Sequence, residues 1–436
     1  MRLKTWAALA AALCLPLLSS CGDDNAQNGF VRIVNATYEY SGLDLYTLNS
    51  DGSSDVVVSG TAAGAASAYA SIDKGTHTFE PKSSGSAGSL PTASGTITKA
   101  NHFAVVSTLT GTTTTTTFVS EEETNPASGN AKLRVMNAAS SEAPSVDVYL
   151  ISNDCTALRV TDSAFATAVT DLQASYKQVT ASTAGTPWNV CVFATGDTST
   201  LLLDIPALTL KNQEIATLIL THTPGGVLLN AAVLDQQGTF TSHANAIARV
   251  RVVADAANAQ TVSVTINGIV YANVAPSPSV GAYMTVTAGA LTPTIAINGL
   301  AVSSFAALPA LTAGNDYTLM VTGTNSAPGA WLITDSNTPS TSTTNTVKAR
   351  VINGLNGSSG TVSATVDGRS IGSAVFGTAG PYTLILPSNG TSTVRGITTG
   401  ATPPDLTLKT FSAGNVDTIF IYGDASVPKM DQVVDR

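Results

Sequence analysis

One opening motif occurs four times along this chain, and it constrains the fold more than any other feature of the sequence. Each copy contains an apolar run led by an arginine, a turn of small residues and a second run in which apolar and polar residues alternate. The repeated arginines are Arg32, Arg134, Arg251 and Arg350, which lie 102, 117 and 99 residues apart. About one hundred residues is the size of one small β-sandwich. The repeat therefore predicts a tandem array of small domains instead of one large core.

The runs that follow each turn predict strands. In the second copy, residues 146–150 alternate between apolar and other side chains, which is the period of a strand with one buried face. In the third and fourth copies the alternating run ends at an Asn-Gly pair (267–268) and an Asp-Gly pair (367–368), which are strong hairpin signals. No long segment has the 3.6-residue period of an amphipathic helix. We therefore predict an all-β fold.

We expect four tandem, small immunoglobulin-like β-sandwich domains after a lipoprotein signal peptide. Polar stretches rich in Ser, Thr, Asn, Gly and Pro mark the linkers between them. The linkers are predicted at residues 121–130, 236–245 and 336–346. The predicted domains cover residues 30–120, 131–243, 246–335 and 347–428.

The composition excludes several classes of protein. The chain has 436 residues with 20 basic and 29 acidic side chains, so its formal net charge is −9. Charged residues make up 11% of the sequence and hydrophobic residues 43%. Disordered chains combine low hydrophobicity with high charge, long helical proteins need many charged residues, and nucleic-acid-binding proteins need a basic surface. We expect instead an extracytoplasmic β-protein whose surface is built from Ser, Thr, Asn and Gly, with no nucleic-acid partner.

The N-terminal segment predicts export from the cytoplasm. Two basic residues precede an apolar stretch, residues 6–18, which is shorter than the about 20 residues that a transmembrane helix needs. The stretch runs into Leu-Ser-Ser-Cys at 18–21, which resembles the bacterial lipobox, whose cysteine becomes lipid-modified and N-terminal after processing. We therefore predict a signal peptide at residues 1–20 and lipid attachment at Cys21. The alternative is an ordinary secreted protein that is cut nearby, with Cys21 as a spare thiol.

The lipid that this resemblance implies would anchor the protein to a membrane without spanning it. Residues 21–29 are polar and are interpreted as a lipidated tether below the first domain. Gly22 follows the cysteine at the position where lipoproteins kept at the inner membrane typically carry Asp, so the resemblance favours the outer membrane. We expect the protein in the cell envelope, at the outer membrane. The sequence leaves open whether it lies on the periplasmic or on the surface-exposed face.

The sequence has four cysteines, and two of them remain for pairing in the folded protein. Cys14 leaves with the signal peptide, and Cys21 is the predicted lipid site. Cys155 and Cys191 are 36 residues apart, and the oxidising envelope favours a disulfide between them. The alternative, a redox or metal pair, lacks a neighbouring Cys or His at ligand spacing. We therefore predict a structural disulfide.

The motif copies resemble a known bacterial family. The second copy reads RVMNAASSEAPSVDVYL, and this opening is similar to the pattern that begins the extracytoplasmic domains of unknown function 4397. The residues that match the pattern are Arg134, Val135, Ala139, Ser140, Val146, Asp147, Val148 and Tyr149, and more loosely Arg32, Val34, Asp44 and Tyr46. The resemblance implies tandem β-sandwich repeats on lipoproteins or surface proteins. The family has no established activity, so the resemblance implies a fold and a location alone.

The charged residues of the motif have a structural interpretation. Arg32 with Asp44, and Arg134 with Asp147, lie on consecutive runs that we expect to pair as neighbouring strands. A charge pair across two strands helps to set their register. The alternative is that these side chains contact a ligand.

One segment matches a catalytic motif in its letters. Gly368, Ser370 and Gly372 fit the G-x-S-x-G elbow of α/β-hydrolases, which needs a helix after it and a histidine later in the chain. The residues that follow are rich in glycine, and every histidine precedes Ser370. We interpret the segment as part of an Asp-Gly hairpin, and we predict no catalytic residue.

The sequence has no metal signature. A zinc motif would require two histidines within about five residues of each other. No two histidines of this chain are that close; they are His77, His102, His222 and His243. Residues 49–55 place oxygen side chains at alternate positions, as a calcium loop does, but the glycine and glutamate positions of an EF-hand hold Ser54 and Gly60. A polar hairpin turn explains these residues better. We predict no metal and no cofactor, and calcium binding at 49–55 stays open.

Two tryptophans remain after the signal peptide, and each has two interpretations. Trp188 and Trp331 are stacking platforms for a glycan if exposed, or core and interface residues if buried. On a strand, Trp188 and Cys191 point to opposite faces, so Trp188 faces outward if Cys191 faces inward.

These observations favour a protein that is not an enzyme. We expect a membrane-anchored envelope lipoprotein that is a structural or binding module, with an envelope protein or a glycan as its ligand. The main alternative is a surface adhesin or glycan-binding protein, and an enzyme is the third. An exposed aromatic or apolar patch would favour binding, and a deep pocket with clustered His, Asp and Glu would favour an enzyme.

Overall fold

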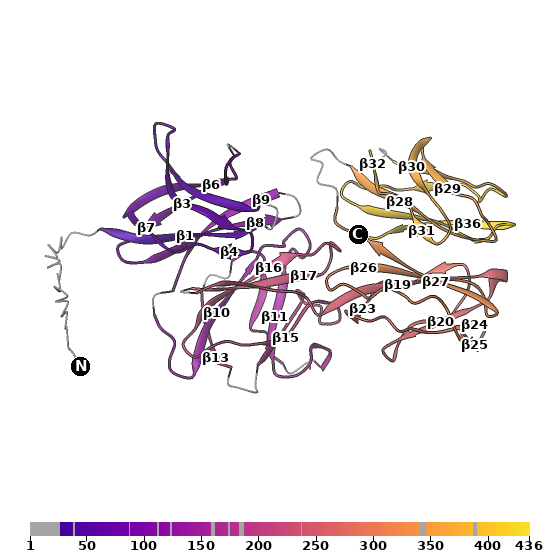
Figure 1. The fold of residues 1–436 in the computed structure, drawn as a ribbon, viewed down its shortest axis with the longest axis horizontal. Helices are drawn as coiled ribbons and strands as arrows, with labels where there is room; N and C mark the ends of the chain where they lie inside the picture. The colour runs from indigo at the N-terminus through magenta and orange to yellow at the C-terminus, as the bar shows by residue number, and fades with distance from the viewer. Residues whose placement is uncertain are drawn as a thin grey trace, which may run out of the picture.

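The structure is a computed structural model that describes residues 27–436, with gaps at 38–39, 87, 111–112, 123, 158–161, 173–174, 183–186, 237, 340–345 and 387–389. The predicted signal peptide and Cys21 lie outside the described residues. Strands dominate the described chain (Figure 1), with two short 3₁₀ turns, η1 (Cys155–Ala157) and η2 (Ala257–Ala259). No helix in the described ranges has the length and apolar character to cross a membrane. The predicted all-β class is confirmed.

The described strands form eight sheets, which fall into four groups along the sequence. In each group a five-stranded and a four-stranded sheet enclose an apolar core. We call these groups unit 1 (residues 28–120), unit 2 (130–243), unit 3 (247–335) and unit 4 (347–434). The units are sandwich-like, while their immunoglobulin-like subtype and their independent folding stay predictions.

Units 1 and 2 occupy the N-terminal half of the described chain. In unit 1, the five-stranded sheet contains β1 (Asn28–Ala36), β4 (Ala65–Ala66), β5 (Ala70–Asp73), β8 (His102–Thr110) and β9 (Thr113–Ser120), and the four-stranded sheet contains β2 (Gly42–Leu48), β3 (Ser54–Ala62), β6 (Gly75–Ser83) and β7 (Ala93–Ile97). In unit 2, the corresponding sheets contain β10 (Asn130–Asn137), β13 (Lys177–Thr180), β16 (Ile215–His222), β17 (Leu229–Asp235) and β18 (Phe240–His243), and β11 (Val146–Ile151), β12 (Ala166–Val169), β14 (Trp188–Ala194) and β15 (Leu201–Leu208). β18 forms within the stretch predicted as a linker and pairs with β17.

Units 3 and 4 repeat this arrangement. In unit 3, the five-stranded sheet contains β19 (Ile247–Ala256), β22 (Ser279–Val280), β23 (Met284–Thr287), β26 (Asp316–Thr324) and β27 (Ala327–Asp335), and the four-stranded sheet contains β20 (Val262–Ile266), β21 (Ile269–Ala275), β24 (Thr294–Ile297) and β25 (Leu300–Ala301). In unit 4, the sheets contain β28 (Val347–Asn356), β31 (Thr378–Ala379), β32 (Thr383–Ile385), β35 (Val416–Asp424) and β36 (Val427–Val434), and β29 (Val362–Val366), β30 (Arg369–Ala374), β33 (Ser392–Ile397) and β34 (Leu406–Lys409).

The arginine-led run is the first strand of every unit. These strands, β1, β10, β19 and β28, lie inside the five-stranded sheets and pair in parallel with β8, β16, β26 and β35. Most of their residues are buried on both faces. A strand that is buried on both faces carries a continuous apolar run instead of an alternating one. The sequence of each run is therefore explained by a second layer that covers the outer face of the sheet.

The predicted hairpins are confirmed. Asn267 and Gly268 connect β20 to β21, and Asp367 and Gly368 connect β29 to β30. All four residues have positive φ, between 49° and 80°, as a type I′ hairpin turn requires.

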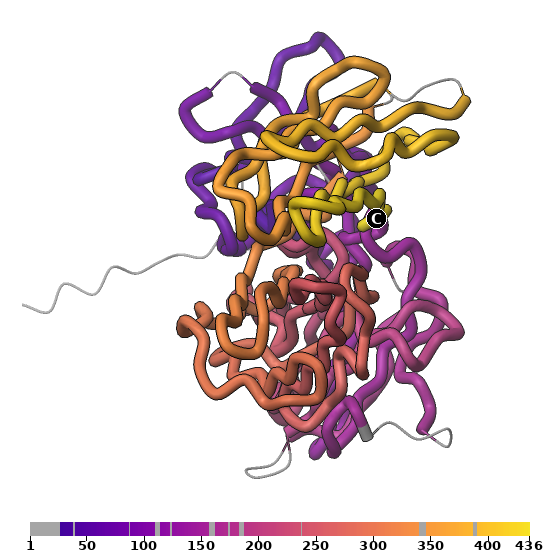
Figure 2. The backbone as a smooth tube through the Cα atoms, turned by 90° about the vertical axis from the view of Figure 1, so that its right-hand side faces the viewer, coloured from indigo at the N-terminus to yellow at the C-terminus, as the bar shows by residue number. Residues whose placement is uncertain are grey.

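The second layer on each five-stranded sheet is the matching sheet of another unit. Figures 1 and 2 show unit 1 against unit 2 and unit 4 against unit 3, so the molecule consists of two pairs of sandwiches. We call them the first pair (units 1 and 2) and the second pair (units 3 and 4). Their contacts are apolar clusters of side chains from both units: Val34, Ala36, Ala104, Val106, Val119, Met136, Ala138, Ile219, Ala232, Leu234 and Phe240 in the first pair, and Val253, Met320, Ile333, Ile352, Phe420 and Tyr422 in the second.

A glycine turn of unit 2 joins the two pairs. The backbone N–H of Asn337 donates a hydrogen bond of 3.0 Å to the carbonyl of Gly225, and Arg436 donates to the carbonyl of Gly226. A Cβ added at Gly226 would lie 2.2 Å from the backbone nitrogen of Thr338, so a side chain cannot fit there. The junction is thus a close backbone contact.

Candidate functional site

The repeated arginines are buried in the contacts within the two pairs. Each is 1–3% exposed. Each guanidinium carbon lies over the ring of a tyrosine from its own unit, at 4.3–4.8 Å from the ring centroid, which is the geometry of a cation–π contact. The four pairs are Arg32 with Tyr69, Arg134 with Tyr176, Arg251 with Tyr283 and Arg350 with Tyr382.

A third position of the repeat lies at or just past the end of β9, β17, β27 or β36, the strand that pairs with the parallel partner of the arginine strand. The arginine pairs with a residue on the neighbouring parallel strand, and that residue pairs in turn with one on the next, antiparallel strand. The third position of the repeat is two residues after this last residue. The residues at this position are Glu121, Gln236, Asp335 and Asp435. The repeat therefore contributes an arginine, a tyrosine and an acid to each contact, except that unit 2 contributes a glutamine.

In the first pair, the three groups form one connected network. Arg32 pairs with Glu121 at 2.8 Å, and its Nη2 donates to the carbonyl of Asp235 in unit 2 at 3.2 Å. The Tyr69 hydroxyl also bonds to Glu121 and donates to the Gln236 carbonyl at 2.6 Å. Side chains of the unit 1 repeat thus bond to the backbone at the end of β17 in unit 2.

In the second pair, the ion pairs cross between the units. Arg251 of unit 3 pairs with Asp435 of unit 4, and Arg350 of unit 4 pairs with Asp335 of unit 3. Arg251 also approaches Asp335 at 3.8 Å. The carboxylates accept further hydrogen bonds, from Thr318 to Asp335 at 2.7 Å and from Thr418 to Asp435 at 2.5 Å. Ion pairs between the two units, as well as apolar packing, therefore stabilise this contact.

The pKa values of these carboxyl groups reflect burial against neighbouring arginines. Burial raises the pKa of Glu121, and Arg32 opposes that shift. Burial acts in the same direction on Asp335, but Arg350 and Arg251 together hold its pKa below the usual value. Asp335 therefore differs from Asp435, whose pKa burial raises although Arg251 opposes that shift.

The predicted Arg–Asp pairs are wrong. Arg32 lies on β1 and Asp44 on β2, which belong to opposite sheets of the sandwich. Asp44 instead accepts hydrogen bonds of 2.7 Å from the Gly60 N–H and from the Ser84 hydroxyl. The turn after each arginine strand carries the chain to the other sheet, so the two runs do not pair.

The second predicted pair fails for the same reason. Arg134 lies on β10 in one sheet of unit 2, and Asp147 lies on β11 in the other. Asp147 accepts hydrogen bonds from the N–H groups of Ala168 at 2.8 Å and Gly196 at 3.1 Å. The tyrosines that do meet the arginines carry a weak sequence signal: each follows a small residue or proline, at 69, 176, 283 and 382.

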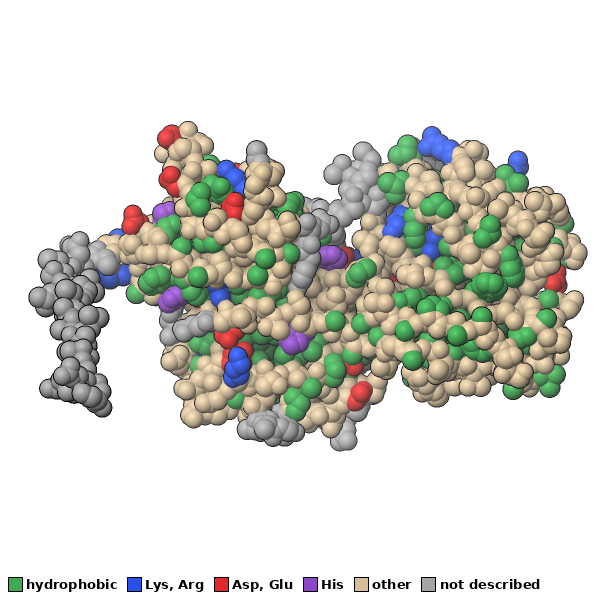
Figure 3. Space-filling model, viewed as in Figure 1, with side chains coloured by type: hydrophobic (Ala, Val, Ile, Leu, Met, Phe, Trp, Pro, Cys, Tyr) green, Lys and Arg blue, Asp and Glu red, His purple; other side chains and the backbone are tan. Residues whose placement is uncertain are grey.

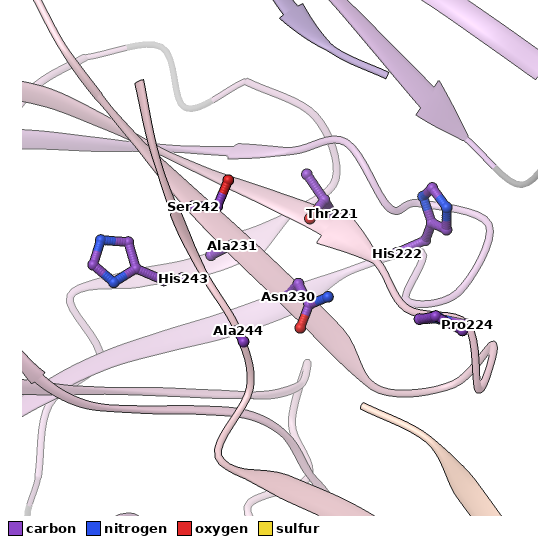
Figure 4. A pocket seen from close by; sticks show the side chains of 8 residues that line it. All are labelled: Thr221, His222, Pro224, Asn230, Ala231, Ser242, His243 and Ala244. Atoms are coloured by element: carbon purple, nitrogen blue, oxygen red, sulfur yellow. The ribbon is translucent and has the colours of Figure 1, made fainter. Parts of the chain in front are cut away.

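A pocket of about 290 Å³ lies at the end of the five-stranded sheet of unit 2. Its walls include His222, Asn230, Ser242 and His243. Figure 4 shows the two histidine rings on opposite sides of the pocket, pointing away from each other. In the described part of the chain, no three His, Cys, Asp or Glu side chains cluster as a metal site would require. The pocket therefore offers polar walls without a converging set of ligands.

A second hollow of about 290 Å³ lies between units 2 and 3. It is lined by apolar residues such as Leu201, Leu228 and Met284, with Arg249 at its wall. The Arg249 guanidinium bonds to Asp316 through two hydrogen bonds of 2.8 and 2.5 Å, so its charge is already paired.

The segments that resembled catalytic or calcium motifs are hairpins. Ser370 lies on β30, directly after the turn at Gly368, so a strand stands where a nucleophile elbow has a helix. At residues 49–55, Ser53 donates to Asp51 through its N–H at 2.9 Å and its hydroxyl at 2.6 Å, and Asn49 donates to Asp55 at 2.9 Å. These oxygen side chains stabilise their own turn.

The structure contains the predicted disulfide between Cys155 and Cys191, with Cα atoms 5.5 Å apart. Cys191 lies on β14, and its side chain belongs to an apolar cluster with Tyr149, Phe193 and Leu201. The disulfide fastens η1, which follows β11, onto the outer face of the four-stranded sheet of unit 2.

Both tryptophans pack against protein. Trp188 contacts the core between the sheets of unit 2, and its Nε1 donates to the Thr180 carbonyl at 2.9 Å. The tryptophan and Cys191 therefore point to opposite faces, but it is the tryptophan that faces inward. Trp331 is 38% exposed, and its ring lies 5.7 Å from that of Phe376 across the second pair. These contacts support the core and interface interpretation.

Comparison with known proteins identifies a family. A family model described as "Domain of unknown function (DUF4397)" matches residues 29–149 and 248–356, which is more than half of the chain. Each matched segment begins at the first strand of one unit and ends in the opening strands of the next. Each therefore contains both arginines of one pair. A search of curated proteins finds no match.

Solved structures resemble this chain weakly. A putative cell adhesion protein from Bacteroides uniformis is 12% identical, with a TM-score of 0.19, over 48% of this chain and 99% of that one. The Bacillus anthracis TIE protein is 10% identical, with a TM-score of 0.14, over 91% of this chain and 68% of that one. The pilus adhesin SpaC from Lactobacillus rhamnosus GG is also 10% identical, with a TM-score of 0.14, over 92% and 42%.

Proposed function

The chain belongs to the DUF4397 family, and from this premise we propose that it is a lipid-anchored envelope protein that acts as a non-catalytic structural or binding module. The observation that carries the proposal is the location of the repeated polar residues. The arginines and acids of the repeat are buried between units, with the half-buried tyrosines stacked over the arginines, and these groups hold the sandwiches together. Polar residues that recur in the units and are buried between them serve packing, as the residues of a structural scaffold do.

The surface supports the same proposal. Figure 3 shows a face made mostly of neutral side chains and backbone, with single charged side chains scattered over it. That face shows no broad cluster of like-charged side chains of the kind that steers a charged ligand. A face with few charged side chains suits a stiff spacer at the cell envelope.

The absence of catalysis is tested with a serine-directed probe. We expect a fluorophosphonate to leave the full chain unlabelled, because Ser370 lies in a hairpin with no described histidine bonded to it. Labelling of the wild type that disappears in Ser370→Ala would contradict the proposal.

The anchor is part of the proposal and rests on the sequence alone. We expect palmitate to label the wild type, and we expect Cys21→Ala to remain unlabelled and to leave the membrane fraction. A Cys21→Ala protein that stays membrane-bound with an unchanged mass would rule out lipid attachment at Cys21.

Adhesion or glycan binding is the second candidate, and one observation favours it. The hollow between units 2 and 3 borders β21, where Ile269, Val270 and Val274 are exposed. Exposed apolar residues beside a hollow are typical of a binding surface. Glycan-array binding by the full chain that is lost in Ile269→Asp, but kept in the distant surface variant Leu408→Asp, would establish this function. Binding to no glycan would leave the scaffold role alone, and equal binding by both variants would exclude this hollow as the glycan site.

A further inference from the structure

The two pairs differ at one position of the repeat. Four residues after each arginine stand Ala36, Ala138, Asp255 and Gly354. In the first pair, the two alanines belong to the apolar cluster between the units. In the second pair, a carboxyl group from unit 3 faces a glycine of unit 4: a Cβ added at Gly354 would lie 2.3 Å from Oδ2 of Asp255. The glycine leaves the room that the carboxyl group occupies.

The Asp255 carboxyl is buried and half satisfied. Its side chain is fully buried, and Oδ1 accepts a hydrogen bond of 2.7 Å from the N–H of Gly423 in unit 4. Oδ2 has no hydrogen-bond partner among the described residues. No described lysine or arginine forms an ion pair with Asp255, unlike Asp335 and Asp435 nearby. A charged carboxylate in this position lacks both water and a counter-ion.

The groups around Asp255 add negative charge or none. On β35, Asp424 accepts the N–H of Asn258 at 2.9 Å, and Tyr422 donates its hydroxyl to Asp431 on β36. The neighbours on β28 and β26, such as Gly354 and Met320, carry no charge. Burial raises the pKa of Asp255 well above its usual value, the hydrogen bond from the Gly423 N–H opposes that rise, and the charge of Asp424 adds to it.

We propose that Asp255 is a pH-sensitive device that loosens the contact between units 3 and 4 reversibly as the pH rises. The neutral carboxylic acid fits the dry contact beside Gly354. The carboxylate that remains after the proton leaves to water needs solvation, and water reaches it only when the units separate at this point. The arginine-paired carboxylates of the same contact keep their counter-ions, so the second pair opens locally and does not unfold.

The direction of the pH dependence follows from linkage. The folded contact binds the Asp255 proton more tightly than the open state does. The contribution of the neutral acid to stability is therefore complete below the usual aspartate pKa and is lost as the pH rises through the raised pKa of the closed contact. The contact is tightest in acid and loosens towards higher pH.

Trp331 provides the measurement, because it lies on β27 of unit 3 against Phe376 of unit 4. In the full chain with Trp6→Phe and Trp188→Phe, we expect the Trp331 emission to shift to longer wavelength as the pH rises from about 4 to about 9. Asp255→Asn should remove the shift. Asp424→Asn, which removes a neighbouring charge, should move the midpoint to lower pH.

Asp417→Asn is the matched control. Burial also raises the pKa of Asp417, to about 6, but Asp417 accepts its hydrogen bond of 2.8 Å from Gln432 within unit 4. Asp417→Asn should therefore keep the wild-type shift. A wild type without a shift, an Asp255→Asn curve that follows the wild type, or an Asp424→Asn midpoint that does not move would overturn the proposal. Loss of strand circular dichroism along with the shift would also overturn it, because the proposal requires opening without unfolding.

Discussion

At the scale of single residues, the repeated arginine is the side chain on which each contact depends. A buried arginine is tolerable only when carboxylates, hydroxyl groups or aromatic faces replace its water. Arg32 has Glu121 at 2.8 Å and the ring of Tyr69 at 4.8 Å, so its charge is matched inside the protein. The guanidinium therefore ties two strands of unit 1 to the neighbouring unit.

We predict that Arg32→Met lowers the free energy of unfolding by about 3–5 kcal/mol, because it leaves the buried Glu121 carboxylate without its counter-ion. Arg369→Met, at an exposed position of β30, is the control and should change it by less than about 0.5 kcal/mol. Urea unfolding followed by circular dichroism measures both. Equal effects of the two variants would mean that the buried arginine contributes no more to stability than the exposed one.

The disulfide is a second feature at this scale. Replacing Cys155 and Cys191 together by serine should lower the stability of unit 2 by about 4 kcal/mol in the chain-entropy account of a 36-residue loop. Differential scanning calorimetry should show one transition at lower temperature and leave the others in place. A uniform shift of all transitions would disagree with a disulfide that acts within one unit.

At the scale of elements, hairpins and first strands could be predicted from the sequence because their causes are local. An Asn-Gly or Asp-Gly pair supplies the positive φ that the turn needs, whatever surrounds it. Pairing between the units could not be predicted in this way, because a continuous apolar run does not say which surface covers it. The tyrosine partners were missed for a related reason: they follow their arginines by 37, 42, 32 and 32 residues, through loops of different length.

The glycine turn between the pairs supports a prediction at this scale. Gly226→Ala should push the two pairs apart, because its Cβ would meet the backbone at Thr338. Gly129→Ala is the matched control, since Gly129 has a similar φ of 82° but open space around its Cβ position. Sedimentation velocity should show a smaller sedimentation coefficient for Gly226→Ala alone. The same value for both variants would mean that the junction does not depend on this contact.

The second pair offers a test of how its strands fit. Gly354→Ala should destabilise the protein, because the new methyl group meets Oδ2 of Asp255. In an Asp255→Ala background, Gly354→Ala should lower the free energy of unfolding by a smaller amount. The difference, which is the coupling free energy, should be about 0.5–3 kcal/mol. A double-mutant cycle from urea unfolding measures this coupling. Additive effects would show that the two residues do not meet.

At the scale of the whole molecule, the repeat has a longer period than one unit. Arg32 and Arg251 are 219 residues apart, and Arg134 and Arg350 are 216 apart, so the pair of sandwiches is itself repeated. The low charge of the chain is consistent with this arrangement, because the first strand of each unit is mostly buried on both faces and offers few exposed positions for charged residues. The molecule therefore consists of two similar pairs of sandwiches joined by a glycine turn, and not of four separate domains in a row.

Small-angle X-ray scattering of the Cys21→Ser chain tests this central claim most directly. The account predicts a compact particle with a radius of gyration close to the roughly 22 Å expected for a single body of about 410 residues. It also predicts a scattering curve that fits the two joined pairs of Figures 1 and 2. A much larger radius of gyration, with the scattering curve of four separated sandwiches, would contradict it.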